Sequence, residues 1–202
     1  MIVLSLFLLL AGVVAEPASE LLFREDWAVS PPEIPLGQNH VANEDLLVEL
    51  HGPGLHGIKK SHHDWIENDP YYVWSGACPG NWLVSLRHKS KSLDLSQGAK
   101  VRWRSKQAGF RQLRIALKLT DGTWLVSSLS AGESKDWEIQ EFELDQARWR
   151  KLNISRVTEE DWVEKPGLES VAEVGFTDLM PGGLSAACSR LDWIEVHGRW
   201  AD

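Results

Sequence analysis

The sequence lacks an excess of basic residues, and it has only two cysteines among its 202 residues. Its 29 acidic and 21 basic side chains give a formal net charge of −8. Binding to nucleic acid or to an anionic membrane is disfavoured, because contacts to phosphate groups need a basic patch. A chain of this length buries roughly 70% of its unfolded surface, so folding requires neither a metal nor a disulfide. The hydrophobic content of 43% excludes intrinsic disorder.

The sequence also lacks the short motifs of common enzyme classes. It contains no GxSxG nucleophile elbow, no P-loop and no glycine-rich dinucleotide-binding pattern. Pairs of carboxylates, which a glycosidase needs, occur throughout a chain with 29 acidic residues, so their presence decides nothing. Tryptophan is abundant instead, with 11 Trp beside 2 Tyr and 5 Phe. The motif search therefore names no catalytic residue.

The first 15 residues, Met1–Ala15, carry no charge and are almost entirely apolar. The small residues Val13 and Ala15 precede a polar stretch that begins at Glu16, a pattern typical of a secretory signal peptide, although the usual basic start is missing. A membrane anchor is the alternative, but a spanning helix needs about 20 residues. We predict a signal peptide at residues 1–15 and a secreted, periplasmic or otherwise extracytoplasmic protein with no transmembrane span in the mature chain.

The predicted export affects the interpretation of the two cysteines, Cys78 and Cys188. An even pair in an exported protein favours one disulfide. Such a bond would stabilise the fold by about 4–5 kcal/mol on the loop-entropy model. Two separate buried thiols are the alternative, because a single pair has no diagnostic spacing. We predict a disulfide between Cys78 and Cys188.

Strand-like alternation recurs along the mature chain. Leu113, Ile115 and Leu117 occupy every second position of the segment 113–119, and this period of two is typical of a half-buried strand. Asp121-Gly122 follows as a hairpin turn signal, after which the partner strand begins at Trp124. Further strands are expected at 82–87, 101–104, 137–144, 171–176 and 191–196.

One short helix is expected at 158–163, where Thr158 and the acidic residues after it resemble a helix N-terminus. Six to nine short strands with one helical connector predict an all-β fold, a single jelly-roll β-sandwich domain over residues 16–202. The predicted core includes Trp103, Leu113, Ile115, Leu117, Phe176, Trp193 and Ile194.

The order of these segments resembles the galactose-binding-domain-like jelly rolls, which include many carbohydrate-binding modules. The resemblance extends over about residues 82–197. It rests on the pattern of the segments Trp137–Leu144, Val171–Phe176 and Leu191–Val196, the last of which reads LDWIEV. It implies a carbohydrate ligand. It also implies a candidate structural calcium ion near the terminal strands, where Glu25, Asp26 and Asp192 offer oxygen ligands. Plain surface charge is the alternative for these three carboxylates.

The segment 51–80 does not alternate and contains several glycines and prolines. A long irregular segment in a compact domain is usually functional or disordered, and its aromatic content disfavours disorder. Flat aromatic faces can stack on sugar rings while polar groups bond hydroxyls. We therefore predict a binding site in which the aromatic residues stack and the polar ones hydrogen-bond; its residues are Trp65, Tyr71, Tyr72, Trp74, His62, His63 and Asp64. The alternative is that these aromatics cover one edge of the sandwich.

Several histidines of this segment, including His51 and His56, could bind zinc with His62, His63 and Asp64, but their spacing fits no known zinc motif. The overall prediction is a secreted, non-catalytic domain that binds a polysaccharide or glycoconjugate, or another surface partner, without a certain cofactor and without nucleic acid. The alternatives are a small β-sandwich enzyme, a polysaccharide lyase or hydrolase, and a purely structural envelope protein. A lyase needs a base beside a neutralising cation, which the histidines and tyrosines with Lys59 and Lys60 could provide.

Overall fold

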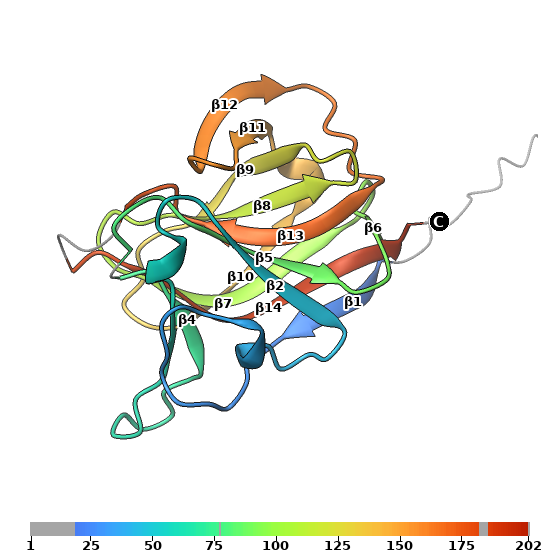
Figure 1. The fold of residues 1–202 in the computed structure, drawn as a ribbon. Helices are drawn as coiled ribbons and strands as arrows, with labels where there is room; N and C mark the ends of the chain where they lie inside the picture. The colour runs from blue at the N-terminus through green and yellow to red at the C-terminus, as the bar shows by residue number, and fades with distance from the viewer. Residues whose placement is uncertain (1–18, 77, 182–185, 202) are drawn as a thin grey trace, which may run out of the picture.

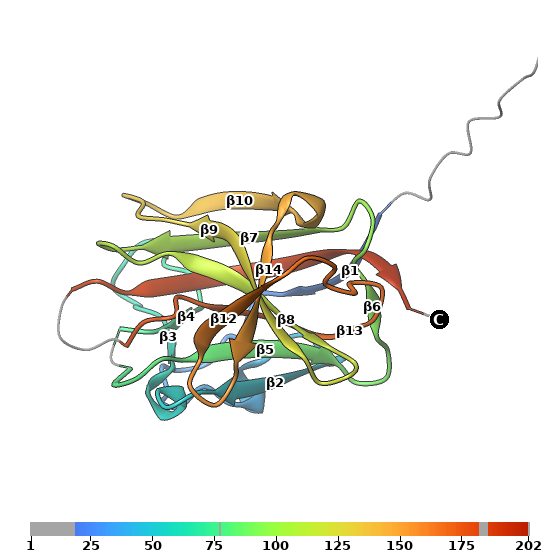
Figure 2. The ribbon, with the colours of Figure 1, turned by 90° about the horizontal axis from the view of Figure 1, so that it is seen from above.

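The computed structural model describes residues 19–76, 78–181 and 186–201, which form two antiparallel sheets packed face to face (Figures 1 and 2). Sheet A contains β1 (Glu20–Glu25), β3 (Lys59–Ser61), β4 (Tyr72–Trp74), β7 (Lys100–Gln107), β10 (Glu138–Glu143) and β14 (Ser189–Trp200). Sheet B contains β2 (Leu46–His51), β5 (Leu83–His88), β8 (Leu113–Leu119), β9 (Trp124–Ala131), β11 (Trp149–Asn153), β12 (Thr158–Val163) and β13 (Val171–Thr177). The short β6 (Leu93–Asp94) pairs with both β13 and the end of β14. The predicted all-β jelly-roll sandwich is confirmed.

Helical structure is limited, within the described ranges, to the single 3-10 turns η1 (Gln38–His40), η2 (Leu55–Gly57) and η3 (Leu144–Gln146). None of the helices in the part of the chain that the structure describes is long and apolar enough to cross a membrane. The predicted signal peptide at residues 1–15 lies outside the described residues.

The long strand β14 organises sheet A. It pairs with β7 along one edge, and β10 lies beyond β7. Its other edge pairs with β1 along one half and with β4 at the opposite end, where β3 then pairs with β4. In sheet B the strands follow the order β2, β5, β13, β8, β9, β11 and β12. This topology brings β4, β7 and β14 side by side although they are distant in the sequence.

The alternation seen in the sequence sends apolar side chains between the sheets. Leu113, Ile115 and Leu117 of β8 are fully buried, whereas Arg114 between them and Lys118 after them are only partly buried. The turn at Asp121-Gly122 is confirmed: Gly122 has a φ of +89°, and the Asp121 carboxylate accepts the Thr123 N–H. All seven residues predicted for the core have at most 8% of their surface exposed.

The expected helix at 158–163 is wrong. These residues form β12, which pairs with β11 at the edge of sheet B. The acidic residues that resembled a helix N-terminus are exposed on this edge strand, and Glu159 contacts Arg114 at 2.8 Å. Tertiary pairing overrides the local helix signal here.

The structure does not show the predicted disulfide. Cys78 and Cys188 are both free, buried thiols, and burial raises the pKa of Cys78 to about 12. Hydrogen bonds hold this end of the sandwich without the bond: Ser75 N–H donates to the Ser189 carbonyl, and Ala108 N–H donates to the Cys188 carbonyl.

Candidate functional site

A cavity of about 390 Å³ lies on the outer face of sheet A, beside the loop that joins β3 to β4. This loop projects from the sandwich at the lower left of Figure 1. The cavity is lined by His63, Ile66, Glu67, Asn68, Asp69, Tyr72, Arg104, Lys106, Asp136, Trp137 and Arg190. Four separate segments of the chain therefore contribute to one hollow.

Outward-pointing side chains of neighbouring strands form the floor of this cavity. In β7 the odd positions point into the core, so Arg104 and Lys106 point outward. The neighbouring strand β14 presents Arg190, which is the register partner of Lys106. Tyr72 of β4 completes the floor, and only 3% of its surface is exposed.

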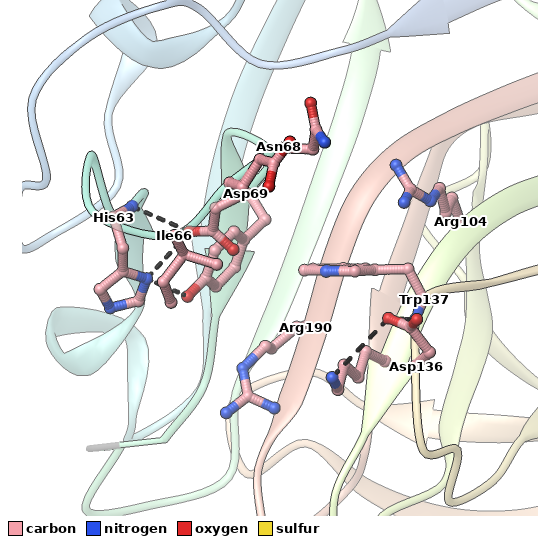
Figure 3. A pocket seen from close by; sticks show the side chains of 11 residues that line it. His63, Ile66, Asn68, Asp69, Arg104, Asp136, Trp137 and Arg190 are labelled. Carbon is pink, nitrogen blue, oxygen red and sulfur yellow. Dashed lines mark hydrogen bonds and ion pairs between the residues drawn. The ribbon is translucent and has the colours of Figure 1, made fainter.

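Trp137, just before β10, forms the aromatic wall. Its ring lies 5.2 Å from the Tyr72 ring in an edge-to-face arrangement, and the Arg104 guanidinium lies 5.7 Å from the Trp137 ring centroid. Figure 3 shows the indole extending toward the Asp69 side of the pocket, with Arg104 on one side of it and Arg190 on the other. Trp137 is only partly buried, so part of its ring surface can be covered by a ligand.

The opposite wall is a hydrogen-bonded group from the β3–β4 loop. The Asp69 carboxylate accepts the backbone N–H of His63 at 2.8 Å, and His63 Nδ1 lies 2.9 Å from the same oxygen. The Tyr72 hydroxyl lies 3.3 Å from His63 Nδ1. Burial raises the pKa of Tyr72, so its phenol stays protonated and can act as a hydrogen-bond donor at neutral pH.

The cations of the pocket differ in how they are paired. Arg104 donates to the Asp192 carboxylate at 2.8 Å, and only 11% of that side chain is exposed. Lys106 lies 3.9 Å from the carboxylate of Asp136, which is 86% exposed. Arg190 has no ion pair with any described residue. The electrostatic character of the pocket therefore depends mainly on Arg190 and Lys106.

Two of the seven predicted binding residues, His63 and Tyr72, line this pocket. The others lie outside its lining. His62 stacks on Tyr71 with 4.0 Å between ring centroids, and its Nε2 lies 3.1 Å from the Asp64 carboxylate, which is 93% exposed. Trp65 and Trp74 also lie outside.

Trp65 is 81% exposed beside His63, with 4.9 Å between the two rings. Trp74 is partly buried in β4, and the Lys59 ammonium lies 5.5 Å from its ring centroid. The sequence also allowed that these aromatics simply cover one edge of the sandwich. This holds for Trp74, because β3 and β4 form an edge of sheet A.

Sequence reasoning missed most of the lining. Arg104 and Lys106 are on the polar side of a recognised strand, and Arg190 begins the last one, but nothing local marks them as neighbours. Trp137 was assigned to a strand, although β10 begins one residue later. Only the pairing of β7 with β14 and of β14 with β4 brings these side chains together.

The three carboxylates expected to bind calcium have protein partners of their own. Glu25 is fully buried and accepts backbone N–H groups from Trp27, Ala42 and Asn43. Burial raises its pKa. Asp26 pairs with Arg24 at 2.6 Å, and Asp192 pairs with Arg104.

One other cluster has metal-ligating atoms. Among the described residues, Glu49, His51 and Glu173 are the only three whose ligand atoms all lie within 4.8 Å of one another. The buried Glu173 carboxylate accepts Ser85 Oγ–H at 2.6 Å and the Lys118 ammonium at 2.7 Å. Burial lowers the pKa of His51. The histidines considered as zinc ligands do not gather, because His51 belongs to sheet B and His62 to the loop between β3 and β4.

Comparison with known proteins gives structural neighbours but no family. No protein-family model matches the sequence, and no curated protein matches it. The chain is similar to the family 11 carbohydrate-binding module from Clostridium thermocellum in complex with a β-1,3-1,4-mixed-linked tetrasaccharide. That match has a TM-score of 0.46 and 16% identity, and it covers 87% of this chain and all of the other.

A variant of a family 29 carbohydrate-binding module is similar as well, with a TM-score of 0.46 and 10% identity over 83% of this chain and 91% of the module. A third neighbour is an exo-β-agarase, at a TM-score of 0.44 and 10% identity, of which this chain covers 23%. TM-scores in this range do not transfer a ligand from one protein to another.

Proposed function

We propose that this protein is an exported, non-catalytic domain that binds a glycan in the pocket on the outer face of sheet A. The observation that carries the proposal is the partly exposed Trp137 ring beside an open cavity rimmed by hydrogen-bonding side chains. Sugar rings have apolar C–H faces and polar hydroxyl edges. A concave site with an aromatic wall and a few placed polar groups is suited to both.

The polar groups support this assignment. Asp69 and the Tyr72 hydroxyl, both held by contacts with His63, offer an acceptor and a donor on one wall. Arg104, fixed by Asp192, offers N–H donors next to the indole. Because these side chains are held by neighbours, little conformational entropy is lost when a ligand binds. We place Trp65 beside this pocket as a further aromatic surface for a longer glycan chain.

The test is retention on a panel of polysaccharides by affinity electrophoresis, with Trp137→Ala as the deciding variant. Loss of a stacking ring should weaken binding by about 1–3 kcal/mol, roughly 5- to 150-fold. Trp162→Ala is the matched control, because Trp162 is 44% exposed in β12, on the other sheet. Equal binding by wild type and Trp137→Ala would reject the pocket as the site.

A polysaccharide lyase is the second candidate, and one observation favours it. Tyr72 and His63 place a phenol and an imidazole 3.3 Å apart beside Arg190, which combines a proton-transfer group with a neutralising cation. A lyase would produce unsaturated uronates with ultraviolet absorbance, whereas a binding domain would retain the polysaccharide unchanged. Absorbance that increases with wild type but not with Tyr72→Phe would establish the enzyme instead.

A further inference from the structure

The floor of the pocket holds two like charges directly opposite each other. Arg190 of β14 and Lys106 of β7 are register partners in the antiparallel pair, and both line the cavity. Side chains at such positions have Cβ atoms about 4.5–5.5 Å apart, and like charges there repel each other. An anion bound between the two would remove this repulsion.

Three carboxylates line the cavity; among the described residues, Glu67 and Asp69 form no ion pair with Arg190 or Lys106, and Asp136 makes only a long contact with Lys106. Asp136 lies 3.9 Å from Lys106 and is 86% exposed, so water and salt screen the contact. Asp69 is turned toward His63, from which its carboxylate receives a backbone hydrogen bond. The next outward cation of β7 provides a contrast, since Arg104 is matched by the nearly buried Asp192.

We infer that the pocket selects an acidic sugar, with the carboxylate or sulfate group bound between Arg190 and Lys106 and the ring against Trp137. A guanidinium offers a planar fork of donors that fits either oxyanion. The ammonium of Lys106 adds a second positive charge from the neighbouring strand. A cavity of about 390 Å³ lies within the usual size range for small-ligand sites. This inference rests on the proposed function and names the ligand class of the same site.

The experiment compares glycans that differ only in their acid group, using the full mature chain and isothermal titration calorimetry. Oligogalacturonides are compared with their methyl esters, in which the carboxylate charge is removed. For the sulfate, κ-carrageenan oligosaccharides are compared with the same oligosaccharides after desulfation. We expect at least tenfold tighter binding of the acidic member in one of these arms, and a preference that declines between 20 and 300 mM NaCl.

Two variants locate the preference. Arg190→Gln and, independently, Lys106→Gln should each lower the affinity for the acidic member more than for its neutral counterpart. The ratio of the two affinities should then fall below about threefold. Lys151→Gln is the charge-matched control, because Lys151 is exposed on β11 in the other sheet. The melting temperature of each variant establishes that it is folded, and Lys106→Gln tests the second cation independently if Arg190→Gln does not fold.

The outcomes separate the two proposals. A preference in the uronate arm alone or in the sulfate arm alone supports the inference and identifies the acid group. Equal affinity for acidic and neutral members, lost in Trp137→Ala, overturns the acidic-sugar inference and leaves the proposed function standing. Binding to none of the four glycans nor to the polysaccharide panel overturns both. A preference that survives in both glutamine variants would also contradict the inference.

Discussion

The outer faces of the two sheets carry the same kinds of residue but are covered differently. On sheet B, Trp124 is 6% exposed and packs in a second apolar cluster. That cluster comprises Leu83, Ala116, Trp124, Val126, Leu152 and Val157. Leu152 and Val157 come from β11 and the turn before β12, the hairpin at the top of the molecule in Figure 1, and their side chains help to bury Trp124. On sheet A, Trp137 is only partly buried and borders a cavity whose opposite wall is the β3–β4 loop.

The comparison shows that residue type alone does not identify a binding surface. Trp124 has neighbours on both sides, with His51 4.9 Å away and Lys118 5.6 Å from its ring. Trp137 has Tyr72 on one side and a cavity on the other. A covered ring contributes to stability, whereas a partly open ring is available to a ligand. Four predictions follow from this distinction.

The largest expected difference is between Trp124→Ala and Trp137→Ala. Removing the buried Trp124 leaves a cavity and should lower the free energy of unfolding by about 3–5 kcal/mol. Trp137→Ala should lower it by less than about 1 kcal/mol, because part of the ring already faces solvent. Urea denaturation followed by circular dichroism measures both. Equal losses would show that the two faces are packed alike.

A second pair of variants compares the ion pairs of the two faces. Glu173→Gln removes the charge from a carboxylate whose side chain is 1% exposed and leaves Lys118 without its partner. We expect a loss of about 2–3 kcal/mol in the free energy of unfolding. Asp136→Asn removes an exposed partner 3.9 Å from Lys106 and should change stability by no more than about 0.5 kcal/mol. The contrast fails if the Asp136 variant is the less stable one.

Lys60 differs from the outward cations of sheet A because it is completely buried, and its ammonium has no hydrogen-bond partner among the described residues. Its ammonium lies 4.5 Å from the centroid of the Tyr71 ring. Burial lowers its pKa from 10.5 to about 8, although Glu25 opposes the shift. An uncompensated buried cation destabilises a fold, so Lys60→Met should stabilise the protein by on the order of 1 kcal/mol at pH 7.

The pH dependence of this effect has a definite sign. Between pH 8 and pH 10.5 the unfolded chain holds the Lys60 proton more strongly than the folded protein does, so wild-type stability gains from rising pH in this window. The advantage of Lys60→Met should therefore be full below pH 8 and disappear near pH 10.5. Urea titrations of both proteins at pH 7, 9 and 10.5 measure it. A constant advantage would mean that Lys60 is not titrating there.

The smallest effect is expected for Trp65→Ala. This ring is 81% exposed, so its removal should change the free energy of unfolding by no more than about 0.5 kcal/mol. The melting temperature should therefore stay near that of wild type. Trp74→Ala, in which a partly buried ring of β4 is removed, is the comparison and should be the less stable variant. A large loss of stability in Trp65→Ala would mean that its ring packs against the protein in solution.

Much of the strand architecture could be predicted because alternation is a local property. The segment 113–119 and its turn at Gly122 were predicted with the correct partner strand, and Trp103 and Phe176 were correctly placed in the core. The failure at 158–163 has the opposite cause. An acidic segment after a threonine satisfies the local rule for a helix start, but its pairing with β11 lies outside that rule.

The candidate site was predictable only in part. His63 and Tyr72 were predicted as binding residues because aromatic and imidazole groups are concentrated in the irregular segment 51–80, and both line the cavity. Arg190 and Trp137 carry no such local mark, since a charged or aromatic residue at the end of a strand is common on any sheet. The same limit applies to the cysteines: an even pair in a chain expected to be exported suggested a bond, whereas both thiols are free in the structure.

The sequence by itself determined that the chain forms β-strands, which side of each strand is apolar and which residues fill the core, because burial of alternating apolar side chains is decided within each strand. The tertiary structure decided which strands are neighbours. Lys106 and Arg190 are opposed only because β7 pairs with β14 in one register, and a shift of β14 by one residue would point Arg190 away from the cavity. The tertiary structure also decided that Trp137 borders an open hollow, whereas Trp124 is buried by side chains of β11 and the turn before β12.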